Sequence, residues 1–317
     1  MKTKTVIIRN SKKNLEFVAS LLIKGEVVAI PTETVYGLAG RADNSKVIRN
    51  IYKIKNRPFS NPLIIHYKNI EEALDSIIID KRAKIITSKF WPGPLTIVAR
   101  KKNNYVSDSA TANLKTVAIR VPSHPDLKTL LHLLDFPLAA PSANIYGKIS
   151  PTCAHDVKEE LNGKISTILD GGKSRIGLES TVIDLTENKT KILRHGSITE
   201  LKLKNILGDI EYNNKVKKIK SPGQVLSHYK PNKKVIIDAK KPITNEAWLG
   251  FGPIPKYFKG PALSLSKNRC LQEAAKNLYS MLRILDKKKS NIIVIQKIPK
   301  KGIGIAINDR LFRASSN

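Results

Sequence analysis

The stretch Pro31-Thr32-Glu33-Thr34-Val35-Tyr36-Gly37-Leu38 follows an apolar run at residues 27–30. This run, Val-Val-Ala-Ile, is typical of a strand buried on both faces, and the proline ends it. Ligands bind at the carboxyl ends of strands in open α/β sheets, so the hydroxyls, the carboxylate and the phenol are predicted to face a ligand. From this stretch alone, a threonine-capped turn with Tyr36 packed inward explains the pattern equally well.

Helix and strand patterns alternate outward from this stretch, which predicts an α/β domain over the first two hundred residues. Before it, Leu15, Val18, Leu21 and Leu22 share one helical face, and Gly25 marks the stop. After it, strands are expected at residues 63–66, 95–99, 117–120, 138–140, 167–169, 181–184 and 191–194. Helices are expected at residues 46–54, 70–74, 127–134 and 154–161.

A polar, lysine-rich segment at residues 207–232 is predicted to be a linker, because Ser221-Pro222-Gly223 interrupts regular structure within it. A small second α/β domain is predicted after it. Its strands are expected at residues 235–237, 262–265 and 292–295 and its helix at residues 271–285. The predicted organisation is therefore a domain at residues 1–206, a linker at 207–232 and a second domain at 233–317.

The composition favours a globular protein with anionic partners. The 317 residues are 41% hydrophobic, and 56 Lys plus Arg against 26 Asp plus Glu give a net charge of +30. This charge favours nucleotides or nucleic acid, although lysine runs are more often solvated surface. No secretory signal and no apolar run of membrane-spanning length are found, and Cys153 and Cys270 form no C-x-x-C. We expect a cytoplasmic protein without disulfide or zinc.

Two basic side chains at a predicted helix end could clamp a triphosphate. Pro58 prevents continuation of the helix, so Lys55 and Arg57 emerge into a loop that contains Asn61. A simple interaction with the helix dipole is the alternative. His66, on the next strand, is by itself more often a core histidine than a ligand.

Two further polar segments follow predicted strands. Ala139-Ala140-Pro141-Ser142-Ala143-Asn144, with Gly147 and Ser150 after it, has small residues that let the backbone approach a ligand, or it is a capped turn. Residues 177–182 and Leu193-Arg194-His195-Gly196 place hydroxyls and an arginine at strand ends. An ordinary surface ion pair and a turn are the alternatives there.

In this order the motifs resemble the YrdC family of threonylcarbamoyl-adenylate synthases, over about residues 15–200. The hydrolase G-x-S-x-G, the zinc H-E-x-x-H and the P-loop are absent. The shared motifs are P-T-E-T-V-Y-G-L, K-x-R with N-P-L, the strand histidine, R-V-P at residues 120–122, S-x-N, S-T-V and L-R-x-G. The tail is similar to the two-domain form of the family at residues 221–223, His228-Tyr229-Lys230-Pro231, residues 273–275 and residues 306–311.

The resemblance implies a twisted, open, mixed α/β sheet with a concave cavity and a Rossmann-like C-terminal domain. It implies a nucleotidyltransferase that converts L-threonine, bicarbonate or CO2, and ATP with Mg2+ into L-threonylcarbamoyl-AMP and pyrophosphate. A downstream tRNA threonylcarbamoyl transferase would use the product at position 37 of tRNA. Whether the chain touches tRNA directly, even weakly, stays open.

By position, the resemblance also implies site residues. Lys55, Arg57, Ser142 and Asn144 would position phosphates and stabilise the leaving group. L-Threonine would be held by Thr34, His66, Arg120, Ala140 and Ser180. ATP would be held by Arg57, Asn61, Thr116, Ser142, Ser150, Arg194 and Tyr229. The linker would cover the cavity and bring His228 and Tyr229 to ATP.

Two alternatives compete with the synthase. The net charge suggests a non-enzymatic module that binds double-stranded RNA or tRNA. A carbamoyl-transfer domain of hydrogenase maturation shares the fold, but the cysteine-rich zinc regions that usually accompany it are absent. The chain also departs from the family at His195, where relatives commonly have proline, and at Gln224-Val225-Leu226 in the linker.

Overall fold

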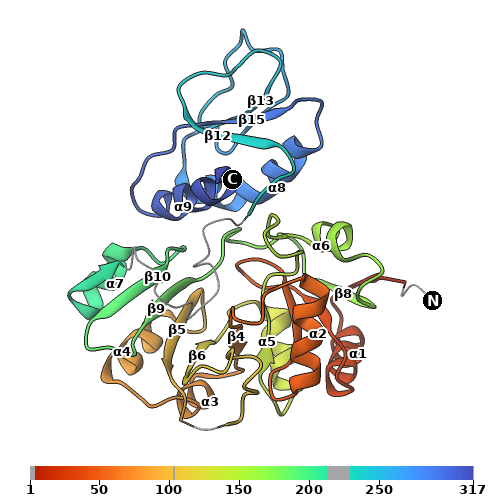
Figure 1. Cartoon of the computed structure of the whole chain (residues 1–317), viewed down its shortest axis with the longest axis vertical. Coiled ribbons are helices and arrows are strands. Elements are labelled where there is room, and N and C mark those ends of the chain that lie inside the picture. Colours follow the sequence, from red (N-terminus) through yellow and green to blue (C-terminus); the bar gives the residue numbers. More distant parts are fainter. Residues whose placement is uncertain (1–3, 103, 213–228, 317) are drawn as a thin grey trace.

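The computed structural model describes residues 4–102, 104–212 and 229–316, which form two parts (Figure 1). The larger part is built on an eleven-stranded sheet and the smaller on a four-stranded sheet. Of the predicted linker, residues 213–228, which include Ser221-Pro222-Gly223, Gln224-Val225-Leu226 and His228, lie outside the described residues. None of the described helices is long and apolar enough to cross a membrane.

The large sheet is mixed, as predicted. It contains parallel pairs, such as β4 (Ile64–His66) with β6 (Thr116–Arg120), and antiparallel pairs, such as β2 (Val28–Ile30) with β3 (Gly37–Arg41). In spatial order its strands are β1 (Val6–Arg9), β8 (Thr167–Asp170), β2 (Val28–Ile30), β3 (Gly37–Arg41), β7 (Leu138–Ala139), β4 (Ile64–His66), β6 (Thr116–Arg120), β5 (Leu95–Arg100), β9 (Thr181–Asp184), β10 (Thr190–Arg194) and β11 (Ile210–Tyr212).

Helices cover both faces of this sheet because strand side chains alternate. Ala29 of β2 packs in a core with helices α2, α3, α4, α6 and α7. Its neighbours Val28 and Ile30 pack in a second core with α1 and α5. The helices are α1 (Lys12–Ile23), α2 (Ser45–Lys55), α3 (Ile70–Asp75), α4 (Lys81–Phe90), α5 (Pro125–His132), α6 (Ala154–Leu161) and α7 (Glu200–Leu207).

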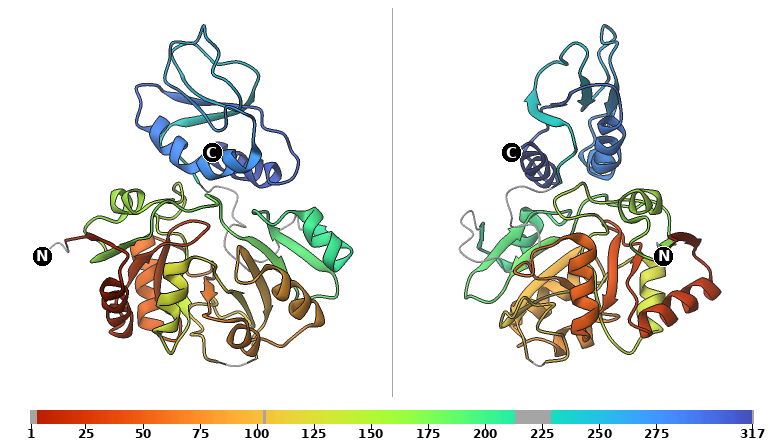
Figure 2. Two further views of the ribbon diagram at one scale, coloured as in Figure 1. Left: turned by 180° about the vertical axis from the view of Figure 1, so that it is seen from behind. Right: turned by 45° about the vertical axis from the view of Figure 1, so that its right-hand side comes forward.

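The smaller part is a four-stranded parallel sheet with two helices. Its strands lie in the order β12 (Lys234–Ala239), β15 (Ile292–Gln296), β13 (Ala247–Gly250) and β14 (Ala262–Ser264). Helices α8 (Leu271–Asp286) and α9 (Gly304–Ser315) lie between this sheet and the larger part (Figures 1 and 2). Val35, Ile149 and Leu178 of the larger part belong to the same apolar core as these helices. The two parts therefore share a core.

The structure differs from the sequence analysis at several elements. Residues 210–212, assigned above to the linker, form β11 and pair in parallel with β10. Residues 37–41 form β3, so the opening stretch connects two antiparallel strands. Strands β1 and β13 and helices α4, α7 and α9 were not predicted. Each of these strands has too few residues to show the alternation of apolar and polar side chains that marks a strand in sequence. Pairing with neighbouring strands decides its conformation.

Candidate active site

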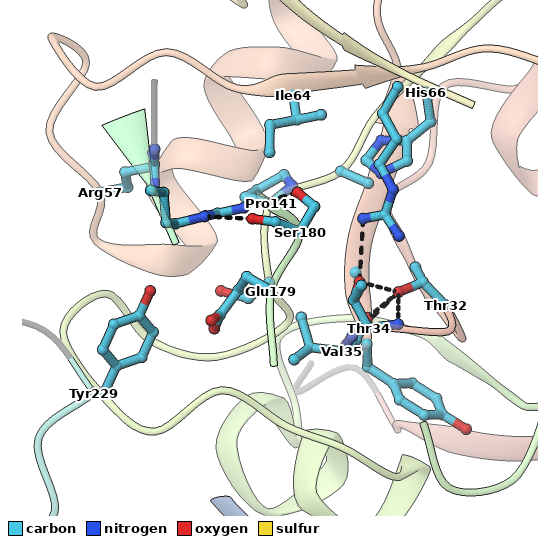
Figure 3. Close-up of a pocket in the computed structure, with 16 residues that line it drawn as sticks. Thr32, Thr34, Val35, Arg57, Ile64, His66, Pro141, Glu179, Ser180 and Tyr229 are labelled. Atoms are coloured by element: carbon cyan, nitrogen blue, oxygen red, sulfur yellow. Dashed lines mark hydrogen bonds between the residues drawn. The ribbon is translucent and has the colours of Figure 1, made fainter. Parts of the chain in front are cut away.

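A pocket on the large sheet brings together most of the predicted site residues (Figure 3). It lies where the β2–β3 connection meets β4, β6, the start of β9 and the end of β10. Nine of the predicted residues line it: Thr34, Arg57, His66, Arg120, Ala140, Ser142, Ser180, Arg194 and Tyr229. Thr32, Thr34 and His66 lie on one side, Arg57 and Tyr229 on the other, and Glu179 and Ser180 between them (Figure 3).

Arg120 organises the hydroxyl-rich side. Its guanidinium donates to Glu33 Oε1 at 2.6 Å, to Thr34 Oγ1 at 3.1 Å and to the carbonyl of Gly93 at 3.2 Å. Thr34 Oγ1 also lies 2.8 Å from Thr32 Oγ1. Both members of the Arg120–Glu33 pair are buried. Burial would raise the pKa of Glu33, but the charge of Arg120 and the hydrogen bonds from Arg120 and from backbone N–H groups together lower that pKa.

His66 is a neutral group on the same side of the pocket. Its side chain is buried, and burial together with the positive charge of Arg120 lowers the pKa of the imidazole to about 3. The ring therefore carries no charge near neutral pH. It can donate and accept hydrogen bonds but cannot neutralise an anion.

Lys55 and Arg57 form the cationic side. Lys55 lies on the buried face of α2 with Ile51 and Tyr52, and Asn56 then ends the helix in a left-handed conformation with φ 52°. Arg57 donates to the carbonyl of Asn61 at 3.0 Å, to Asn61 Oδ1 at 2.6 Å and to the carbonyl of Pro62 at 2.9 Å. Asn61 thus supports Arg57 and does not itself line the pocket.

Lys55 holds the S-x-N segment in place. Its Nζ donates to the carbonyl of Asn144 at 2.6 Å and to the carbonyl of Ser142. The Asn144 amide donates to the carbonyls of Ile145 and Lys148 at 2.8 and 2.9 Å. Of these residues, Ser142 lines the pocket, whereas Lys55 and Asn144 lie behind it.

The two buried cations have only neutral partners. Among the residues that the structure describes, neither Lys55 nor Arg57 forms a salt bridge, and both are buried. Burial lowers the pKa of both groups, and for Lys55 the nearby charge of Arg57 lowers it further. Burying charge without a counterion is unfavourable, so this side of the pocket is prepared for an anion.

Ser180 and Arg194 close the pocket along β9 and β10. Arg194 donates to the Ser180 carbonyl and to Ser180 Oγ, both at 3.0 Å. Position 196 requires glycine, because a Cβ there would lie 2.4 Å from the nitrogen of Thr181 and 2.7 Å from the carbonyl oxygen of Glu179. The glycine of the L-R-x-G motif is therefore required by backbone packing and not by a turn with positive φ.

Glu179 was quoted in the sequence analysis only as a member of a motif, yet it lines the pocket. Its Oε1 accepts from Ser150 Oγ at 2.7 Å, and its Oε2 accepts from Arg310 Nε at 2.9 Å. Tyr279 of α8 donates to the same carboxylate at 2.9 Å. Sequence reasoning missed Tyr279 and Arg310 as neighbours of the site. The available signal was an arginine on the apolar face of a helix.

Thr116 lies apart from the pocket. It begins β6 on the same face as Ala118 and Arg120, and four residues of strand place it about 13 Å from Arg120. A small apolar cluster on the sheet contains Ile64, Val98, Ala118, Val182 and Leu193. Ile64 also lines the pocket, so this cluster continues its floor towards Thr116.

Comparison with known proteins identifies the family. The family model described as "Telomere recombination" (Sua5_yciO_yrdC) matches residues 20–196, and "Threonylcarbamoyl-AMP synthase, C-terminal domain" (Sua5_C) matches residues 198–316. The chain belongs to the Sua5/YrdC family. It is 37% identical to a threonylcarbamoyl-AMP synthase of Pyrococcus abyssi, over 98% of this chain and 97% of the relative. It is 36% identical to the Bacillus subtilis protein of the same name, over 94% and 91%.

Solved structures agree with this assignment to the Sua5/YrdC family. P. abyssi Sua5 complexed with L-threonine superposes with a TM-score of 0.91 at 35% identity, over 99% of this chain and 98% of that one. Escherichia coli YciO shares the fold of the larger part, with a TM-score of 0.53 at 21% identity over 61% of this chain and 96% of that one. The two-domain architecture is therefore that of Sua5.

Proposed function

We propose that the chain is an L-threonylcarbamoyladenylate synthase, a nucleotidyltransferase that consumes ATP, L-threonine and bicarbonate or CO2. The observation that carries the proposal is the division of one pocket into a hydroxyl-rich side with a neutral His66 and a side with buried Lys55 and Arg57. Two-domain relatives named threonylcarbamoyl-AMP synthase, and a Sua5 structure with bound L-threonine, support it.

Threonine fits the hydroxyl-rich side. Thr34, His66, Ala140 and Ser180 offer a neutral imidazole, hydroxyls and a small side chain. The N–H groups of Arg120 that Glu33, Thr34 and Gly93 leave unused remain for the substrate carboxylate. Because Glu33 already balances its charge, Arg120 would orient the carboxylate more than attract it.

The phosphates fit the cationic side. Arg57, Ser142 and Arg194 line it, with Lys55 directly behind. Preorganised cations of this kind stabilise the charge that develops on a departing pyrophosphate. Ser150 and Asn61 act through Glu179 and Arg57, which they contact.

The proposed reaction needs no side-chain nucleophile. The threonine amine adds CO2 and loses a proton to form a carbamate. A carbamate oxygen then attacks the α-phosphorus of ATP. The bond between this phosphorus and the oxygen that bridges to the β-phosphorus breaks, and pyrophosphate leaves with that electron pair. The site has to hold the two substrates in line and exclude water from the carbamate.

Magnesium would enter with the nucleotide. Within the described ranges, no group of three His, Cys, Asp or Glu side chains could hold a metal ion. Mg2+ usually keeps water and phosphate oxygens as ligands, so a nucleotide-borne ion fits these residues better than one caged by the protein. It would neutralise charge on the triphosphate. We also propose that a tRNA threonylcarbamoyl transferase in the cytoplasm consumes the product.

Pyrophosphate release by the purified protein tests the proposal. ATP and magnesium are supplied with and without L-threonine and bicarbonate, and serine replaces threonine as the control. Release that requires both threonine and bicarbonate is expected. Release that is indifferent to threonine, or ATP binding without any release, would overturn the synthase assignment. Salt-sensitive RNA binding without ATP binding would instead favour the RNA-binding alternative.

A further inference from the structure

We propose that Glu179 and Arg310 form a positioning pair through which the C-terminal domain sets the geometry of the ATP side of the pocket. The inference rests on the proposed function and assigns to that function two residues outside the predicted site. Neither residue reacts. Both act through the pocket residues that they hold.

Glu179 connects the pocket wall to the C-terminal domain. It lies just before β9, lines the pocket, and is 6% exposed. On the pocket side it accepts from Ser150 Oγ at 2.7 Å. On the other side it accepts from Tyr279 of α8 and from Arg310 of α9, both at 2.9 Å. One carboxylate thus joins two helices of the smaller domain to a residue of the ATP side.

Arg310 reaches the second strand of the same wall. Its side chain is 1% exposed, and its Nη2 donates to the carbonyl of His195 at 2.8 Å. The preceding residue, Arg194, donates a hydrogen bond to the carbonyl of Ser180. The guanidinium also lies 5.3 Å from the ring centroid of Tyr229. A single side chain therefore fixes the start of β9, the end of β10 and one aromatic lining residue.

Each charge of the pair is balanced by a nearby charge of opposite sign. Burial would raise the pKa of Glu179, but the charges of Arg310 and Arg194, together with hydrogen bonds from Ser150 and Arg310, lower that pKa to about 2. Asp309 adds a second carboxylate on Arg310, at 2.6 Å. Without Arg310, Glu179 would remain a buried anion beside the expected triphosphate and would repel it.

Docking of the two domains does not require this charge pair. The shared apolar core already includes Val35, Ile149 and Leu178. Arg283 adds separate contacts to Glu160 at 3.1 Å and to the carbonyl of Ile149. Buried ion pairs add little net stability compared with apolar packing, and in some proteins they specify geometry. The position of Glu179 and Arg310 at the pocket wall is therefore better explained by orientation of Ser150 and Arg194 than by adhesion.

Steady-state kinetics of the full-length chain tests the inference, with pyrophosphate release as the readout. Arg310→Met and Glu179→Gln are each expected to raise KM for ATP tenfold or more and to change KM for threonine less than threefold. Arg310→Lys restores the charge but not the contact with His195, so its KM for ATP should lie between those of the wild type and Arg310→Met. The KM for ATP of the double variant should not exceed that of the more impaired single variant, because the two residues act as a unit.

Arg283→Met is the matched control. It removes another buried interdomain arginine, which contacts Glu160 and the carbonyl of Ile149 beside Ser150 but not the Glu179 carboxylate. It should lower the melting temperature and change KM for ATP less than threefold. Equal losses for ATP and threonine, or a loss confined to melting temperature in Arg310→Met and Glu179→Gln, would overturn the inference. If Arg310→Met does not fold, Arg310→Lys and Glu179→Gln decide. A wild type without threonine-dependent release would overturn the proposed function instead.

Discussion

The residue that bears most directly on phosphate chemistry is Arg57. Three of its donor contacts go to neutral oxygens of Asn61 and Pro62, so its charge remains available to an anion in the pocket. Arg57→Ala should reduce kcat/KM for ATP by about 10²–10³, the usual effect of removing one preorganised donor. The variant should stay folded, which circular dichroism would check.

Arg49 provides the control for Arg57. It lies on the exposed side of the same helix and carries the same charge. Arg49→Ala should leave turnover within about twofold of the wild type, since surface substitutions rarely matter. Equal effects at both positions would mean that net charge, and not the pocket, governs ATP use.

His66 gives the stability of the protein a defined pH dependence. Its pKa is about 3 in the folded chain, against about 6.5 for an unperturbed histidine. Between these values the unfolded state binds the proton, so the contribution of His66 is complete above pH 6.5 and is lost as the pH falls towards 3. At pH 5 the loss should be about 2 kcal/mol.

Urea unfolding of the wild type and His66→Gln at pH 7.5 and pH 5 measures this loss. The free energy of unfolding should fall further in the wild type than in the variant. His132→Gln, on the exposed side of α5, is the matched control and should behave like the wild type. The same pH dependence in wild type and His66→Gln would contradict a neutral buried imidazole.

The sequence predicted site residues best where motif and strand end coincide. Arg120 and Arg194 end strands β6 and β10, and Arg57 follows the end of helix α2; all three line the pocket. Arg310 was not predicted because its partner Glu179 lies 131 positions away in the sequence. A local pattern cannot show such a pair; only the docking of two domains creates it.

At the scale of elements, α8 depends on a glycine of the other domain. Gly177 has φ +77°, and a Cβ there would lie 2.6 Å from both the Cα and the carbonyl oxygen of Lys276 in α8. Gly172 has a similar φ of +80°, but its Cβ would meet nothing within 4 Å. An alanine would meet the same unfavourable backbone conformation at both positions but would clash with α8 only at position 177. Comparing the two substitutions therefore distinguishes backbone strain from steric contact.

Gly177→Ala should destabilise the protein by about 1–3 kcal/mol more than Gly172→Ala, because α8 must shift to make room. Thermal unfolding of both variants measures the difference. Equal destabilisation would mean that α8 does not pack on this loop.

Elements of eight or more residues were predictable when their apolar residues recurred at helical spacing or when turn residues marked their ends. α2 and α8 were placed within one residue of their ends. β11 was not found, because Ile210-Glu211-Tyr212 offers one alternation inside a lysine-rich segment, and only pairing with β10 makes it a strand. The long helix α4 was missed although Asp80 caps it, because its apolar face is short.

At the scale of the whole molecule, the domains share both an apolar core and a buried charge pair. Leu178 and Ile149 pack with residues of α8 and α9, and Glu179 pairs with Arg310. Two compact units joined this way should unfold as one, since separation would expose the shared core and take Arg310 away from the Glu179 carboxylate.

The two tryptophans allow this cooperativity to be measured, because one lies in each domain. Trp91 is buried in the larger domain and Trp248 in the smaller one. Trp91→Phe leaves a fluorescence reporter of the C-terminal domain, and Trp248→Phe leaves one of the catalytic domain. Each variant should unfold in urea with the same midpoint whether followed by its remaining tryptophan or by circular dichroism. If the tryptophan midpoint in either variant departs from the circular dichroism midpoint by more than about 0.5 M, the domains unfold independently, and the shared apolar core is then too small to couple them.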